Sequence, residues 1–309
     1  MFEHSRRVFT GMMALLMARS IPNEGVARPT PRAPGRAALI ALALATAGLL
    51  LPKQVFAEDL PVDGLDVARR IDERAEGDAS RRVVDIVLTD RRGKTRERSA
   101  LVLKSRDDGS RSTRFTYLAP KSVKDVTFLS RDDLASEGGD ERWLYLPATR
   151  KVRRIPASDR GDYFLGTDFT YEDIQSEFKL SLRDYDFTLD SSRRSEDGTI
   201  YVLSATPKTE AIARELGYGG LSAEVDGNSW LFRRAEFFDL QGDPLKTVTV
   251  HAAEAIDGIW CATDVEVVNH QTGHETRFLY REVAYPPAFP EQVFSASSLS
   301  RGLPQEYLP

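Results

Sequence analysis

The chain has 309 residues, of which 41% are hydrophobic and 29% charged, with a formal net charge of −5 and a single cysteine. Residues 1–57 hold seven Lys or Arg and two Asp or Glu, so residues 58–309 carry a net charge of −10. This acidic balance argues against binding to nucleic acid and disfavours tight binding to anionic lipid head groups. The lone Cys261 excludes an internal disulfide, and its apolar neighbours favour a buried side chain over a reactive thiol.

The N-terminal region has the three parts of a secretory signal peptide. Residues 37–51 form an uncharged apolar run, three arginines precede it, and Val55-Phe56-Ala57 resembles an A-x-A cleavage site. The run is shorter than the ~20 apolar residues that cross a bilayer, which disfavours an uncleaved anchor. We therefore expect cleavage after Ala57, export to the periplasm and a single mature domain over 58–309, with Met17 as an alternative start of the chain.

The mature chain is predicted to begin with one helix and to continue as strands. Apolar residues at three-residue spacing predict a helix over 62–76, which Gly77 ends. Beyond it the apolar residues alternate, and turns rich in Asp and Gly separate the segments. The expected strands fall at 84–88, 100–104, 115–117, 126–128, 143–146, 151–155, 185–189, 200–205, 221–225, 230–238, 245–251, 259–268 and 276–285.

We expect about eleven of these segments to form strands in meander order, with 151–155 a short return and 221–225 the weakest candidate. No parallel βαβ alternation is present. A mainly β, antiparallel meander of this length closes into a barrel, splits into a sandwich, or curls into an open half-barrel over a helix. A short helix is predicted at 209–216.

Residues 156–176 interrupt the strands with a long connection. It carries five large apolar side chains: Tyr163, Phe164, Leu165, Phe169 and Tyr171. Connections are usually polar, because their backbone must stay hydrated. The segment is therefore expected either to insert into the core, with a helical turn at 171–176, or to cover a cavity.

Motifs for catalysis and metal binding are weak. The sequence has no G-x-S-x-G elbow, phosphate-binding loop, G-x-G-x-x-G or H-E-x-x-H motif. His270 and His274 flank a turn without an evident third ligand, so we expect solvated histidines rather than a metal site. The carboxylates between Asp159 and Asp173 are interpreted as a solvated, helix-capping group rather than an acid/base pair. We expect no enzyme activity and no cofactor.

A basic run, Arg150, Lys151, Arg153 and Arg154, alternates with little apolar content. The first interpretation is a charged edge that prevents strand-to-strand aggregation. The alternative is a docking face for an acidic partner or a lipid phosphate.

The sequence contains many aromatic residues, spread over most of the expected strands. An ordinary sandwich core accounts for many of them. Together with the apolar connection, they also suit a concave β surface that holds an acyl chain.

Two blocks carry a family resemblance: Trp143-Leu144-Tyr145-Leu146-Pro147, and Phe164-Leu165-Gly166-Thr167-Asp168-Phe169-Thr170-Tyr171-Glu172-Asp173. They resemble the outer-membrane lipoprotein-sorting protein family, relatives of the periplasmic carrier LolA, and the likeness extends over the mature chain. The resemblance implies an unclosed β-barrel lidded by helices that binds acyl chains of a lipoprotein or lipid beside an inner-membrane RND-type exporter. A regulatory module of similar fold, which binds a membrane-protein partner in envelope-stress sensing, is the alternative.

On this basis we expect two groups of functional residues. The side chains expected to line the cavity or its lid are Phe115, Tyr117, Phe128, Trp143, Tyr145, Phe164, Leu165 and Phe169. The side chains expected to form the partner face are Arg150, Lys151, Arg153 and Arg154.

Overall fold

The computed structural model describes residues 63–107, 109–133 and 140–309, all of which lie in the unit Asp59–Pro309. The predicted signal peptide and its cleavage site fall outside the described residues. None of the described helices is long and apolar enough to span a membrane.

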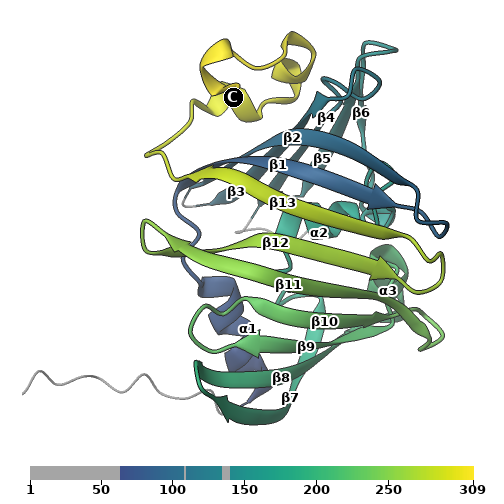
Figure 1. Cartoon of the computed structure of the whole chain (residues 1–309), viewed down its shortest axis with the longest axis vertical. Coiled ribbons are helices and arrows are strands. Elements are labelled where there is room, and N and C mark those ends of the chain that lie inside the picture. The colour runs from purple at the N-terminus through teal and green to yellow at the C-terminus, as the bar shows by residue number, and fades with distance from the viewer. Residues whose placement is uncertain (1–62, 108, 134–139) are drawn as a thin grey trace, which may run out of the picture. The chain divides into compact units, whose positions relative to one another are not determined.

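The described residues form one antiparallel sheet of thirteen strands (Figure 1). Their bounds are β1 Ala79–Thr89, β2 Thr95–Arg106, β3 Ser110–Ala119, β4 Thr127–Asp133, β5 Glu141–Leu146, β6 Lys151–Arg154, β7 Tyr185–Ser195, β8 Gly198–Pro207, β9 Gly220–Asp226, β10 Phe232–Phe238, β11 Pro244–Ile256, β12 Ile259–Asn269 and β13 Glu275–Ala284. The order is β6-β5-β4-β3-β2-β1-β13-β12-β11-β10-β9-β8-β7, so β6 and β7 are free edges and the barrel is not closed. The mainly β, unclosed fold is confirmed. The expected number of strands was too low, because the segments at β6 and β9 both form full members of the sheet.

The first strand of the chain, β1, pairs with the last, β13, at the centre of the sheet. β1 runs antiparallel to β13 from Arg81 opposite Ala284 to Thr89 opposite Glu275, with a register shift after Arg81. Another irregularity lies between Val250 and Ala252, where β11 pairs with β12. Such bulges bend and twist a strand, which helps the sheet to curl around one face.

In the part of the chain that the structure describes, three short α-helices accompany the sheet: α1 Gly64–Glu73, α2 Tyr171–Ser176 and α3 Glu210–Leu216. The predicted turn at 171–176 and helix at 209–216 are confirmed. α1 is shorter than predicted, because Arg74 already has an extended ψ of 142°. Its Asp63 side chain caps the helix by accepting a hydrogen bond from the Asp66 amide at 2.9 Å. Gly64 is required there, since a Cβ would lie 2.6 Å from the backbone nitrogen of Thr188 on β7.

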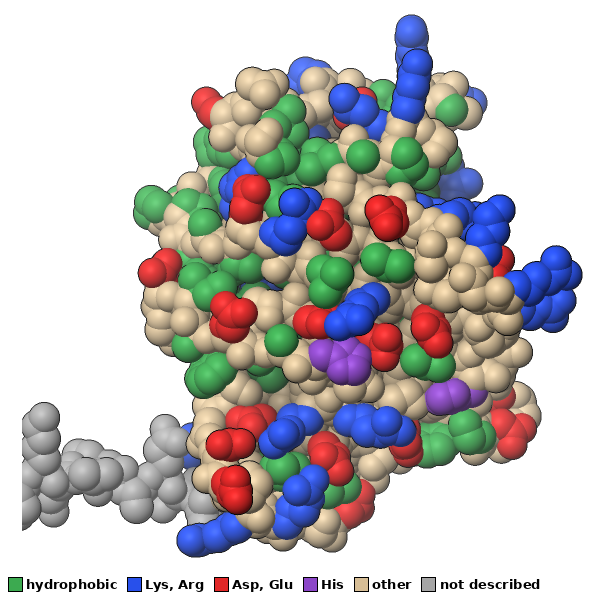
Figure 2. Space-filling view, in the orientation of Figure 1, with side chains coloured by type: hydrophobic (Ala, Val, Ile, Leu, Met, Phe, Trp, Pro, Cys, Tyr) green, Lys and Arg blue, Asp and Glu red, His purple; other side chains and the backbone are tan. Residues whose placement is uncertain are grey.

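The two faces of the sheet are covered differently. α1 and α2 lie behind the strands in Figure 1, against the main hydrophobic core. The C-terminal segment, with 3-10 turns η2 Glu291–Phe294, η3 Ala296–Arg301 and η4 Gln305–Tyr307, covers part of the opposite face. This explains why β2 is buried on both faces from Ala100 to Lys104. The remaining outer face carries intermixed acidic and basic side chains (Figure 2). A fourth 3-10 turn, η1 Ala157–Asp159, precedes α2.

Candidate functional site

A tight loop directs two phenylalanines of the 156–176 connection into the concave face of the sheet. The Phe164 amide donates to the Phe169 carbonyl at 2.7 Å, and the Thr167 amide donates to the Phe164 carbonyl at 2.9 Å. Leu165 and Gly166 turn the chain with φ values of 48° and 79°. Phe164 becomes fully buried as a result.

Phe164 is the centre of an aromatic cluster. Its ring centroid lies 5.0 Å from that of Phe115, 5.5 Å from that of Phe128 and 5.4 Å from that of Tyr171, and all three pairs are edge-to-face. Such pairs stabilise by about 0.5–1.5 kcal/mol beyond the burial of their area. The connection therefore inserts into the core, as one of the two expectations had it.

Buried polar contacts fasten this connection to the sheet. Lys246 on β11 donates to Asp173 on α2 at 2.5 Å and to the Tyr218 hydroxyl at 2.7 Å. Thr276 on β13 donates to Asp168 at 2.7 Å and accepts from the Asp168 amide at 2.9 Å. Burial raises the pKa of the Asp168 carboxyl, although the Thr276 hydrogen bond opposes that shift.

Asp168 and Asp173 are buried and bonded to the sheet, so the expectation of a solvated group of carboxylates is wrong for these two. Asp173 also completes a capping box with Thr170 at the start of α2. Both aspartates belong to the second of the two blocks that carried the family resemblance. That block therefore specifies how the connection is held against the sheet.

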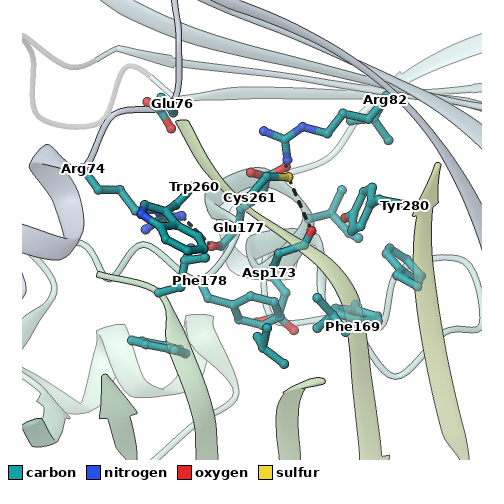
Figure 3. Close-up of a pocket in the computed structure, with 18 of the residues that line it drawn as sticks. Arg74, Glu76, Arg82, Phe169, Asp173, Glu177, Phe178, Trp260, Cys261 and Tyr280 are labelled. Carbon is teal, nitrogen blue, oxygen red and sulfur yellow. Dashed lines mark hydrogen bonds and ion pairs between the residues drawn. The ribbon is translucent and has the colours of Figure 1, made fainter. Parts of the chain in front are cut away.

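A pocket lies between α2 and the concave face (Figure 3). Its cavity volume is about 60 Å³, because side chains fill most of the space between α2 and the sheet. Its apolar wall consists of Ala75, Val102, Phe115, Phe169, Ile174, Phe178, Leu231, Phe232, Val250, Trp260, Cys261, Ala262, Val265, Phe278 and Tyr280. A concave, mainly apolar pocket with a few polar groups is the usual form of a small-molecule site.

One end of the pocket is charged. Arg74, Glu76, Arg82 and Glu177 line it there, and Arg82 donates to Glu177 at 2.8 Å. Burial raises the pKa of the Glu177 carboxyl, but Arg82 and Lys104 outweigh it and lower that pKa to about 2. Glu177 is therefore ionised at neutral pH.

A second, more polar cavity of about 650 Å³ adjoins the other side of α2. Its charged lining is extensively ion-paired: Arg142 lies 3.3 Å from Glu172, and Arg160 lies 2.8 Å from Asp184. Asp132 also lines it, and burial raises the pKa of this carboxyl to about 8, with Asp140 and Glu172 adding to the shift.

The structure separates the residues expected to line the cavity. Phe115 and Phe169 line the pocket, while Tyr117, Phe128 and Phe164 are buried in the adjoining core and Leu165 packs against it. Trp143 and Tyr145 lie elsewhere. They pack on the opposite face, in the cluster with Val293, Phe294 and Leu299, because the alternation of β5 turns Leu144 towards the main core instead.

The residues of the expected partner face lie together at one edge of the sheet. Lys151, Arg153 and Arg154 belong to β6, whose four residues are all exposed, and Arg150 lies in the turn before it. Arg154 pairs with Glu141 at 3.3 Å across two exposed side chains.

Sequence reasoning missed several lining residues. Phe178, Arg74, Arg82 and Glu177 carried no motif, and Glu177 and Phe178 adopt left-handed backbone conformations just after α2. Phe278 lies on a predicted strand, but its face was not assigned. Among the described residues, no group of three or more His, Cys, Asp or Glu is placed to hold a metal ion.

Comparisons with known proteins agree with this architecture. A family model whose description reads "uncharacterized protein" matches residues 109–301. An outer membrane lipoprotein-sorting protein domain from Vibrio parahaemolyticus has 25% identity and a TM-score of 0.69, over 77% of this chain and 98% of that one. The chain belongs to the family of this model, and its fold is similar to that of the LolA-like outer-membrane lipoprotein-sorting proteins.

Two further solved structures share the fold of this LolA-like protein. A DUF1329 family protein from Desulfovibrio piger has 26% identity and a TM-score of 0.69, over 76% of this chain and 97% of that one. A LolA superfamily protein from Nitrosomonas europaea, at 18% identity and a TM-score of 0.57 over 76% of this chain and 98% of that one, shows the likeness in fold alone. No curated protein sequence matches the chain.

Proposed function

We propose that this LolA-like protein is a periplasmic, non-catalytic carrier that holds an acyl chain of a lipoprotein or lipid in the pocket between α2 and the sheet. The observation that carries the proposal is the apolar wall of that pocket, in which Phe115, Phe169 and Phe278 face the concave side of the sheet. Each methylene that leaves water contributes about 0.8 kcal/mol, so partial shielding of a long chain already supports binding.

The pocket has to enlarge before it accepts a long chain. Its cavity volume is about 60 Å³, and the aromatic cluster around Phe164 fills the neighbouring concavity. The connection that carries Phe164 and α2 is held to the sheet by side-chain contacts of Asp168 and Asp173. Outward movement of this connection, with these two anchors as the restraint, would open the concavity to the chain.

The carrier also needs a source and a destination for its cargo. We place an inner-membrane RND-type exporter at the source, with the exposed basic edge of Arg150, Lys151, Arg153 and Arg154 as the docking face and the outer membrane as the destination. Edge β6 supports this assignment, because its side chains are all exposed and its basic charge complements an acidic partner surface.

A steric test addresses the pocket directly. Ala262 lies on β12 in the pocket wall, whereas Ala252 on β11 is exposed and is not a lining residue. Ala262→Phe should lower the affinity of the exported protein for a fluorescent palmitoyl probe at least tenfold, and Ala252→Phe should leave it unchanged. Equal affinities in the two variants, both folded by circular dichroism, would place the acyl chain elsewhere and remove the pocket assignment.

A further inference from the structure

The charged end of the pocket belongs to a larger basic cluster. The cluster comprises six basic side chains, Arg74, Arg82, Lys104, Arg106, Arg111 and Lys179, and three acidic side chains, Asp72, Glu76 and Glu177. It joins the end of α1, the start of β1, the end of β2, the start of β3, and the residues just after α2. Its members come from segments far apart in the sequence, so composition gave no sign of it.

Each inner carboxylate of the basic cluster is shared by several cations. Glu177 lies 2.8 Å from Arg82 and 3.2 Å from Lys104. Glu76 lies 2.8 Å from Arg106, 3.1 Å from Arg111 and 3.2 Å from Lys179. The ion pairs of the cluster therefore leave an excess of positive charge in a largely buried place.

One buried donor of the cluster, Arg82 Nε, has no hydrogen-bond acceptor among the described groups, and Lys104 Nζ lies 3.2 Å from Glu177 without the geometry of a hydrogen bond. Arg82 and Lys104 are 6% and 7% exposed. A buried donor without an acceptor costs about 1–3 kcal/mol, and more when it is charged.

The two buried lysines of the cluster have lowered pKa values, whereas the burial of Arg82 is outweighed by Glu177, which raises the pKa of Arg82. Burial lowers the pKa of the Lys104 ammonium, and the neighbouring Arg82 and Arg111 lower it further against the attraction of Glu177 and Glu76. Burial likewise lowers the pKa of Lys179 to about 8. An additional anion at this place would compensate both groups.

Four members of the cluster, Arg74, Glu76, Arg82 and Glu177, meet the apolar wall in one pocket, and Lys104 lines a small adjoining pocket together with Glu76 and Arg82. Figure 3 shows Glu76 and Arg82 at the upper side of the pocket and Phe169 at the lower side, with Glu177 and Trp260 between them. A ligand that spans the pocket would therefore place an apolar part against Phe169 and a polar part beside Arg74 and Arg82. This is the chemistry of an amphiphile with a negative head.

We propose that the basic cluster binds the anionic head group, a phosphate or a carboxylate, of the amphiphile whose chain occupies the apolar part of the pocket. The proposal rests on the carrier function and specifies its class of cargo. The net charge of −10 of residues 58–309 argued against binding of an anionic head group. That argument does not hold for a local, buried site, because the charge of a whole domain does not describe the charge at one place in it.

Three amphiphiles with the same C16 chain test the proposal: hexadecyl phosphate, hexadecanol and hexadecylammonium. Calorimetry or displacement of a fluorescent fatty acid from the exported protein should show hexadecyl phosphate binding at least tenfold more tightly than the other two. Equal affinities for the three would overturn the head-group site and leave the carrier function intact. Binding of none of the three would overturn both the head-group site and the carrier function. Saturable binding of inorganic phosphate with the same affinity as hexadecyl phosphate would show an anion site to which the alkyl chain contributes nothing, and would overturn the proposal.

A charge-neutral variant locates the effect. Lys104→Gln should lower the affinity for hexadecyl phosphate about tenfold and leave the affinity for hexadecanol within twofold. The retained affinity for hexadecanol also shows that the variant is folded. Lys94→Gln, in the exposed turn before β2, carries the same change of charge and should have no effect. Equal losses for hexadecyl phosphate and hexadecanol in Lys104→Gln would contradict a role for this cluster in head-group binding.

Discussion

Lys246 on β11 lies 2.5 Å from Asp173 on α2, and the two side chains are 0% and 5% exposed. The same ammonium contacts the faces of Tyr218 and Phe237, with ring centroids 4.9 and 5.1 Å away. This buried pair connects the helix that covers the pocket to the middle of the sheet. It therefore links the stability of the fold to the opening that the proposed carrier requires.

Removal of one partner of this pair should be costly. Lys246→Met leaves Asp173 buried without its cation and is expected to lower the free energy of unfolding by about 3–5 kcal/mol. The double variant Lys246→Met/Asp173→Leu should recover part of that loss, because no uncompensated charge remains. Urea denaturation measures the free energy of unfolding of these two variants and of Asp173→Leu alone. If the loss in the double variant equals the sum of the losses in the two single variants, the pair is not coupled.

The buried carboxyl of Asp132 predicts a pH-dependent stability. Its pKa is about 8 in the folded protein, mainly through burial, against an ordinary value of 3.8. A raised folded-state pKa contributes stability that is complete below pH 3.8 and is lost as the pH rises through 8. Asp132→Asn should therefore raise the Tm above pH 8 by roughly 2–4 °C, or about 1 kcal/mol. That gain should shrink towards pH 4 in thermal scans, and a gain independent of pH would contradict the assignment.

The C-terminal segment should support the fold without taking part in acyl-chain binding. Phe294 is 6% exposed and packs with Leu101 and Leu129 on the face opposite the pocket. Phe294→Ala is expected to cost about 3–5 kcal/mol of unfolding free energy. Affinity for a palmitoyl probe, measured well below the lowered Tm, should stay within twofold of the native value. A large loss of affinity there would show that the two faces are coupled.

The basic edge should matter for transfer and not for binding. Arg153→Glu/Arg154→Glu reverses two exposed charges on β6, and Arg193→Glu/Arg194→Glu reverses two on β7, the opposite edge of the sheet. Only the first variant should slow lipid release from inner-membrane vesicles to the carrier, by about tenfold, with palmitoyl affinity unchanged in both. An unaltered transfer rate in the β6 variant would remove this face as the docking site.

The sequence was sufficient to predict most of the fold, because alternating apolar residues and Asp-Gly turns report local structure directly. For the connection around Phe164 the large apolar residues left two placements open, insertion into the core or a cover over a cavity, and the structure shows insertion. The faces of β5 could not be assigned from the sequence. Trp143 and Leu144 are both apolar, so alternation alone does not say which of them meets the main core. The basic cluster escaped prediction for a different reason. Arg82, Lys104 and Glu177 meet only through tertiary structure, and each is an ordinary charged residue in its own segment.

Native mass spectrometry of the protein purified from the periplasm, with extraction of any bound lipid, shows directly whether the protein carries an acyl chain. The carrier account predicts an additional mass that organic extraction releases as a lipid or an acylated peptide, and that is reduced in Ala262→Phe but retained in Ala252→Phe. A clean mass of the polypeptide alone, with no uptake of added phospholipid or lipopeptide, would contradict the account.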